Sequence, residues 1–280
     1  MMKKSILGLI TILLFSILGF GQTTPQLQLS KVEDFQEAFK AIPCKNSERL
    51  PAVKALFLQM GAKEEDIVIE KIGDVKNIVI KKQGKSTEKI VVGAHYDLTG
   101  SGSCGATDNW TGIVAIAHLY RSIKDISTNK TILFVGFDKE EEGLVGSKAM
   151  VSKIKKENIA EYCAMLNIDG LGMNTPQILK GVSDESLQEL AKSTAKTLEV
   201  PLQIIEISTA SSDSASFREK KIPAATISEI PQKWMEIYHN KADQADKINH
   251  ISVYLAYRIA FLMLTQIDEK DCQAFRKQKK

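Results

Sequence analysis

The sequence has 280 residues, of which 44% are hydrophobic and 25% charged, and its formal net charge is +3 at pH 7. These values are ordinary for a globular protein and exclude a disordered or fibrous chain. No basic stretch is interleaved with aromatic residues, so we expect no nucleic-acid partner.

The first residues have the pattern of a secretory signal peptide. Lys3 and Lys4 precede an apolar run over 6–20, and Gly19-Phe20-Gly21 offers a small-x-small cleavage site. The run is shorter than the roughly 20 apolar residues needed to span a bilayer. We therefore expect residues 1–21 to be removed, with no stable membrane insertion afterwards. Residues 22–280 should form a single domain, exported to the periplasm or the extracellular space.

Four cysteines follow this segment, and they allow three disulfide connectivities. Export permits disulfides. Cys44 and Cys104 both lie in loop-like sequence, which makes them the favoured pair. Cys163 lies beside an apolar strand, and we expect it to be a buried free thiol.

Helices and strands alternate along the chain. Ser30–Gly61 has a helical pattern, with expected breaks at Pro43 and near Pro51. Further strands are expected over 67–70, 75–82, 90–94, 131–137, 164–168 and 224–228, and further helices over 111–124, 144–156, 184–198 and 252–267. This alternation predicts an α/β sandwich with a largely parallel central sheet.

Polar residues follow several of these strands at the point where each strand ends. His95 and Asp97 follow the first buried strand, Asp138 and the glutamates 140–142 follow the next, and Asp169 follows the third. His239 lies in a loop after the last short strand. The carboxyl ends of parallel strands share one edge of the sheet, where ligands gather. Because unpaired buried charge is costly, a metal ion would explain this convergence.

Each of these features has an ordinary explanation when taken alone. An H-x-D triplet occurs by chance, and glutamates in the first turn of a helix are favoured by its dipole. A single aspartate can cap a turn, and a single histidine is more often a surface or core residue. His118 and His250 are expected to be structural.

Five segments, in their order and contexts, resemble the co-catalytic di-zinc aminopeptidases, whose relatives include glutamate carboxypeptidases and glutaminyl cyclases. The segments are GAHYD (93–97), GATDNWTG (105–112), FDKEEEGLVGS (137–147), NIDGLG (167–172) and YHNKAD (238–243). The resemblance covers the chain from about residue 50 onward. It implies a three-layer sandwich with a mixed, mostly parallel sheet flanked by helices, the phosphorylase/hydrolase-like fold of zinc exopeptidases.

The resemblance also implies two zinc ions. His95 and Asp169 would bind one ion and Glu141 and His239 the other, with Asp108 bridging the two. Imidazole nitrogens and carboxylate oxygens are normal ligands for catalytic zinc with an open position.

Three further residues receive roles from the resemblance. Asp97 would hold the His95 ring by its other nitrogen, and Glu140 would be the general base. Tyr238 could donate to a developing oxyanion or could be a packing aromatic. The sequence leaves these two roles for Tyr238 open.

The implied function is that of a secreted zinc metallopeptidase that removes amino-terminal residues from peptides. The nucleophile would be a zinc-bridged hydroxide, with a glutamate as general base. Glutaminyl cyclase or carboxypeptidase activity and a catalytically silent binding domain are the alternatives. A carboxypeptidase needs a basic clamp for the terminal carboxylate, and Arg49 and Arg218 stay open as candidates.

Three positions depart from the family pattern. Lys139 replaces a common glycine, Trp110 replaces a small residue, and Ser214 replaces a common histidine. None of them is an implied ligand, so they bear on substrate preference.

Overall fold

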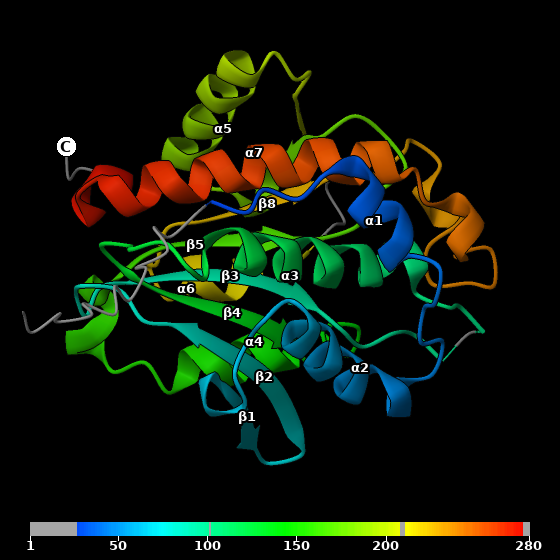
Figure 1. Cartoon of the computed structure of the whole chain (residues 1–280), viewed down its shortest axis with the longest axis horizontal. Coiled ribbons are helices and arrows are strands. Elements are labelled where there is room, and N and C mark those ends of the chain that lie inside the picture. Colours follow the sequence, from blue (N-terminus) through cyan, green and yellow to red (C-terminus); the bar gives the residue numbers. More distant parts are fainter. Residues whose placement is uncertain (1–26, 101, 208–210, 277–280) are drawn as a thin grey trace, which may run out of the picture.

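A computed structural model describes residues 27–100, 102–207 and 211–276. The expected signal peptide, residues 1–21, lies outside the described residues. The described chain contains an eight-stranded sheet with helices on both faces (Figure 1).

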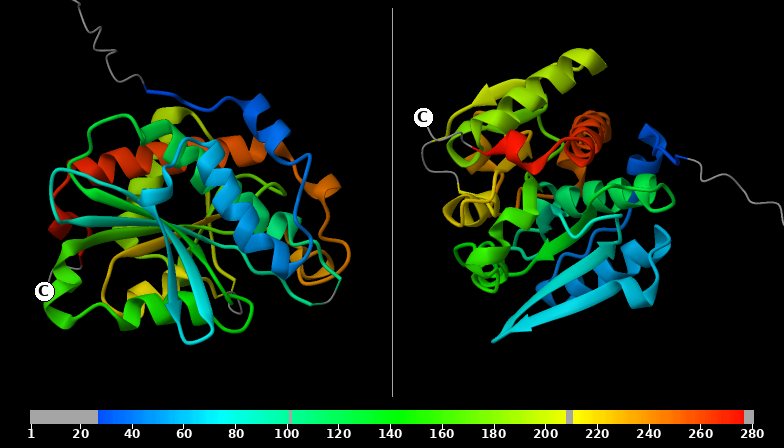
Figure 2. Two further views of the ribbon diagram at one scale, coloured as in Figure 1. Left: turned by 60° about the horizontal axis from the view of Figure 1, so that its bottom comes forward. Right: turned by 90° about the vertical axis from the view of Figure 1, so that its left-hand side faces the viewer.

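The strands lie in the order β1-β2-β4-β3-β5-β8-β6-β7. Their bounds are β1 Ile67–Ile72, β2 Val75–Lys82, β3 Lys89–His95, β4 Thr131–Phe137, β5 Tyr162–Ile168, β6 Gln177–Leu179, β7 Gln203–Ile205 and β8 Ala224–Ser228. The central strands β4, β3, β5 and β8 are parallel, while β1 and β2 form an antiparallel hairpin at one edge. The sheet is therefore mixed but parallel at its centre, as expected, and it twists along its length (Figure 2).

The two faces of the sheet carry separate apolar clusters. The larger cluster lies under α1 Val32–Ala38, α2 Asn46–Gln59, α3 Thr111–Ile123, α5 Glu185–Leu198 and α7 His250–Glu269. The smaller lies under α4 Val145–Ser152 and α6 Ser214–Glu219. Within β3, Val92 faces the larger cluster and Val91 the smaller, as strand alternation requires.

Helix α7 is long and apolar enough to cross a membrane by length and composition alone. In the described chain, however, it crosses the sandwich beside α3 and α5 (Figure 1), with Val253, Ala256 and Ile259 buried in the core. It is thus a core helix of the sandwich.

The expected break at Pro51 is wrong, because α2 runs through that residue. Proline in a helix interior costs about 3 kcal/mol. The face of α2 that carries Val53 and Phe57 is fully buried in the core, and this burial offsets the cost.

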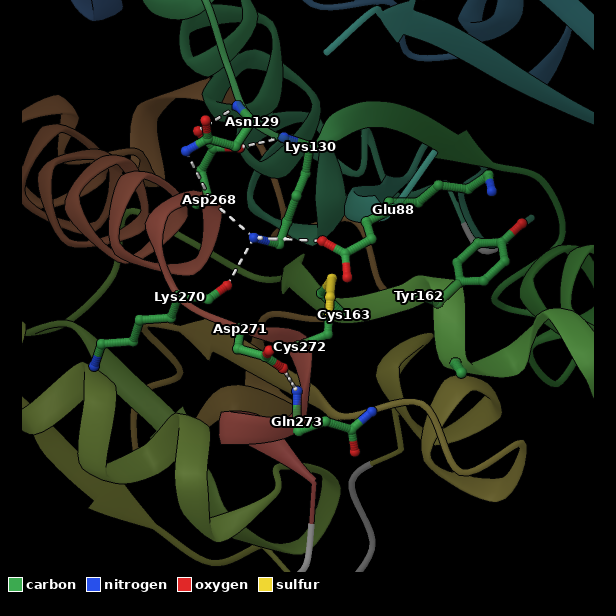
Figure 3. Close-up of a disulfide and its surroundings, with 12 residues drawn as sticks. Glu88, Asn129, Lys130, Tyr162, Cys163, Asp268, Lys270, Asp271, Cys272 and Gln273 are labelled. Carbon is green, nitrogen blue, oxygen red and sulfur yellow. Dashed lines mark hydrogen bonds and ion pairs between the residues drawn. A yellow bond between two sulfur atoms is a disulfide. The ribbon is translucent and has the colours of Figure 1, made fainter. Parts of the chain in front are cut away.

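The prediction that Cys163 is a free thiol is also wrong. Cys163 on β5 is disulfide-bonded to Cys272, with their Cα atoms 4.4 Å apart. Figure 3 shows the surroundings of this bond, where Lys130 Nζ donates to the carbonyls of Asp268 and Lys270. The bond and these contacts hold the segment after α7 against the sheet. Sequence spacing could not reveal a pair separated by 109 positions.

The favoured pair, Cys44 and Cys104, forms the second disulfide, with a Cα–Cα distance of 4.3 Å. It joins the segment just before α2 to the loop after β3.

Candidate metal centre

Five residues expected as ligands come together at the carboxyl edge of the parallel strands, and they form two groups. In the first, His95 ends β3 and Asp169 directly follows β5. The Nε2 atom of His95 lies 3.1 Å from Asp108 Oδ1 and 3.4 Å from Asp169 Oδ1. The His95 side chain is only 1% exposed.

The second group lies nearer to solvent. His239 Nε2 is 3.2 Å from Asp108 Oδ2 and 3.0 Å from Glu141 Oε2, and the His239 side chain is 51% exposed. In each group the three candidate ligand atoms lie within 4.8 Å of one another. Asp108 is the shared member, and its two oxygens face different histidines.

The loop that carries Asp108 is fixed by hydrogen bonds to Asp243. The buried Asp243 carboxylate accepts from Thr107 N and Thr107 Oγ1, both at 2.7 Å, and from Asp108 N at 3.2 Å. The next side chain, Asn109, donates to Ile168 O at the end of β5. These contacts tie the Asp108 loop to both the His239 loop and the sheet.

Asp97 links the His95 ring to the glutamate turn. Its oxygens accept from Glu140 N at 3.0 Å and Glu141 N at 3.1 Å. Asp97 Oδ1 is also 3.4 Å from His95 Nδ1, slightly longer than an ordinary hydrogen bond. Asp97 therefore lies where the sequence expected it and also positions Glu141.

The charges in the site affect one another strongly. Burial acts to lower the pKa of His95, but hydrogen bonds with Asp108, Asp169 and Asp97 raise it well above its ordinary value. Hydrogen bonds with Asp108 and Glu141 raise the pKa of His239 to about 10. Such crowded carboxylates favour nearby positive charge, which bound cations would supply.

Glu140 lies beside this centre on the turn after β4. Burial, the largest effect, raises the pKa of its carboxyl well above the ordinary value, with His95 opposing and Asp169 and Asp213 adding to the rise. A carboxylate with a raised pKa can accept and release a proton near neutral pH.

Two buried residues with no assigned role from sequence also border the site. The Ser212 hydroxyl donates to Asp169 Oδ2 at 2.5 Å. Burial raises the pKa of the neighbouring Asp213 to about 7. The Ser212-Asp213 pair followed by Phe217 is the signal that could have identified them, since it resembles a family motif.

Tyr238 lies against the loop after β5. A Cβ atom at Gly170, where φ is +67°, would lie close to the Tyr238 hydroxyl, so a larger residue would displace the ring. The hydroxyl has no hydrogen-bond partner among the described residues. Burial raises the pKa of Tyr238 well above its ordinary value, so the group stays protonated.

Two departures from the family pattern have structural explanations. Lys139 has φ +55°, the left-handed region that favours glycine, and its Nζ atom pairs with Asp74 at 2.5 Å. Trp110 is buried beneath the Arg49 guanidinium, 5.1 Å from it. Trp110 therefore packs largely inside the protein.

The donor set fits zinc. Both groups offer imidazole nitrogen and carboxylate oxygen, which are common zinc ligands. Asp108 can give one oxygen to each of two ions, because its oxygens face opposite groups.

Comparison with known proteins agrees with this chemistry. Residues 77–263 match the model of peptidase family M28. Leucine aminopeptidase 1 of Blastomyces gilchristii is 27% identical over 217 residues, covering 66% of this chain and 56% of that protein. The chain spans about half the length of the curated leucine aminopeptidases it matches.

Two solved structures show the same fold. LapA aminopeptidase of Legionella pneumophila has a TM-score of 0.73 and 22% identity, covering 87% of this chain and 72% of its own. A glutaminyl cyclase from an Acidobacteriales bacterium also has a TM-score of 0.73 and 16% identity, covering 89% of this chain and 97% of its own.

Proposed function

Because this chain belongs to peptidase family M28, we propose that it is a zinc aminopeptidase acting on peptides with a free amino terminus. The observation that carries the proposal is the pair of ligand groups that share Asp108. Two zinc ions per chain would fill these groups, with His95 and Asp169 on one side and Glu141 and His239 on the other.

Zinc would supply a Lewis acid that polarises the peptide carbonyl and lowers the pKa of water. The protein's own residues handle the proton. Glu140 accepts it from the attacking water and returns it to the departing amine, and its buried place beside the ligand groups supports this role. Tyr238, whose buried hydroxyl has no hydrogen-bond partner among the described residues, would donate to the developing oxyanion.

The charge of the adjoining cleft favours a substrate with a free ammonium group. A cleft of about 710 Å³ reaches Glu141. It is lined by five acidic residues and two lysines, namely Asp74, Asp97, Asp138, Glu141, Glu142, Lys76 and Lys139. With Glu141 bound to zinc, four acids and two lysines remain, and this excess of negative charge still favours an ammonium group over the terminal carboxylate that a carboxypeptidase must hold.

Neither arginine candidate for a carboxylate clamp is available. Arg49 is 0% exposed and donates to backbone carbonyls. Arg218 forms an ion pair with Asp184 at 3.4 Å. The Asp184 carboxylate accepts from Ala224 N at the amino end of β8. This is the opposite edge of the sheet from the ligand groups. Carboxypeptidase activity is therefore the weaker proposal.

Glutaminyl cyclase activity is the second candidate, because the structural likeness to a cyclase covers almost the whole of both chains. A cyclase would use one zinc ion. The complete pair of ligand groups supports the peptidase instead.

We further propose that residues 22–280 form one catalytic domain that is exported to the periplasm or beyond. The apolar run over 6–20 and the two disulfides support export, because disulfides persist in oxidising compartments. Mass spectrometry of the protein from its native host should find a chain that begins near Gln22. A mature chain that keeps residues 6–20 would refute this part.

The activity is tested with three substrates on one zinc-loaded preparation. Aminoacyl-p-nitroanilides should be cleaved, and amino-terminally acetylated peptides should resist. Gln-peptides should be shortened rather than cyclised. Loss of carboxyl-terminal residues from acetylated peptides, or pyroglutamate formation without cleavage, would contradict the aminopeptidase assignment.

A further inference from the structure

Arg49 is a fully buried charge in the core of the described chain. It lies on α2 and is 0% exposed. Its Nε donates to Pro43 O at 2.7 Å, and its Nη2 donates to Cys104 O at 2.5 Å and to Gly105 O at 2.8 Å. A buried guanidinium is tolerated only where such partners compensate its lost hydration. Burial lowers the pKa of Arg49 to about 10, so it stays charged at neutral pH.

The two carbonyls that Arg49 binds belong to the loop that ends at Asp108. The same loop is held at its other end by Asp243, which accepts from Thr107 and from Asp108 N. A buried cation thus binds the loop's carbonyls while a buried anion binds its amides. Neither Arg49 nor Asp243 is one of the candidate ligands, so both act on Asp108 through its loop.

The backbone of the loop leaves little room for another arrangement. Gly105 has φ +55°, and a Cβ atom there would lie 2.8 Å from Arg49 Nη2 and 2.8 Å from Asp108 O. The Cys44–Cys104 disulfide adds a covalent link between the start of α2 and the same loop. Movement of the guanidinium would therefore be transmitted to Asp108.

We propose that Arg49 is a positioning residue for the two-metal site: by holding the carbonyls of Cys104 and Gly105, it sets Asp108 so that one carboxylate oxygen faces each ligand group. Asp108 is shared by both ligand groups. Loss of Arg49 therefore lowers the zinc affinity of both groups together. This inference rests on the proposed two-zinc site.

A merely structural role for Arg49 predicts something different. It would lower the free energy of unfolding of the metal-free protein and leave zinc affinity unchanged in the folded fraction. Loss of a group that orients metal ligands commonly weakens metal binding by about 10- to 100-fold. We expect the affinity for both zinc ions to fall at least about tenfold in Arg49→Met and less in Arg49→Lys, which keeps the charge and one donor nitrogen.

Arg276 offers a matched control. Its guanidinium also donates to backbone carbonyls, those of Lys221 at 2.9 Å, Ile159 at 2.9 Å and Tyr162 at 2.7 Å. These contacts lie near the amino end of β5, away from the ligand groups. Arg276→Met therefore removes the same kind of interaction without touching the Asp108 loop.

The experiment is a titration of the metal-free, full mature chain with zinc against a competing chelator, with the folded state checked by circular dichroism. Wild type and Arg276→Met should bind two zinc ions with equal affinity, and Arg49→Met should bind both more weakly. Zinc affinity unchanged in Arg49→Met, or equally reduced in Arg276→Met, would overturn the proposal. If Arg49→Met does not fold, the zinc affinity of Arg49→Lys is compared with that of wild type in its place, and unchanged affinity would again overturn the proposal.

The titration separates this inference from the proposed activity. Failure of the proposed function would appear as wild-type protein that binds zinc but releases no amino-terminal residue. Failure of the Arg49 inference would appear as unchanged zinc affinity in the variants, whatever the activity.

Discussion

Removing the Cys163–Cys272 disulfide is expected to destabilise the protein substantially without changing its active site. The bond joins β5 to the segment after α7, across 109 positions of sequence. Both cysteines are buried, and the nearby Lys130 contacts already hold the same segment. Reduction therefore leaves the folded state with most of its contacts and acts mainly on the unfolded chain.

The expected loss in the free energy of unfolding follows from the length of the loop that the disulfide closes. Chain-entropy theory gives about 5 kcal/mol for a loop of this size, and measured losses are about 2–5 kcal/mol. A loss of about 3 kcal/mol corresponds to a fall in Tm of roughly 6–12 °C for a chain of this size class.

The assay is urea unfolding of a Cys44→Ala/Cys104→Ala background, compared in its oxidised and reduced forms. This comparison isolates the Cys163–Cys272 bond, because no atom other than the two thiol hydrogens changes. The reduced form should unfold at a lower urea concentration. Equal midpoints in the two forms, or two free thiols by peptide mapping of the oxidised form, would refute the reasoning.

Three further predictions concern the metal centre. Glu140→Gln should keep both zinc ions and lower kcat by about 100-fold or more; an active variant in a steady-state assay would remove Glu140 from the base role. Asp108→Asn should weaken both zinc equivalents, measured by metal analysis after dialysis, and selective loss of one ion would argue against bridging. In the metal-free protein the pKa of His239 is raised from 6.5 to about 10. The protonated imidazole therefore stabilises the folded state fully below about pH 6.5, the pKa in the unfolded chain. This stabilisation is lost as the pH rises through about 10. The Tm of the metal-free wild type should therefore fall more between these pH values than that of His239→Gln, and parallel profiles would contradict this.

The buried strands were predictable because their local pattern and their burial agree. The bounds of β2, β4 and β8 match the expectation, since each contains a short stretch rich in apolar and β-branched residues. The strands β6 and β7 have three residues each, too few for a periodic pattern to show. Both pair only after distant segments have come together.

The convergence of candidate ligands was predictable in part for a different reason, while the full set of five came from the family resemblance. His95 and Asp169 follow parallel strands, so strand direction alone brings them to one edge. The residues that hold these ligands were not predictable in the same way. Arg49 and Ser212 reach the site from outside the parallel strands, and their contacts depend on how α2 and the loop before α6 pack. The local sequence of Arg49 gives no sign of its contact, whereas Ser212 is marked only by the Ser212-Asp213 pair followed by Phe217.

The unequal exposure of the two histidines has a consequence for metal exchange. His239 is 51% exposed, whereas His95 is 1% exposed. An ion held at the His239 side would be reached by a chelator from solvent more readily than an ion at the more buried His95 side. Brief chelation should then produce a species with one ion, and refilling it with cobalt would place a spectroscopic probe at the outer position alone.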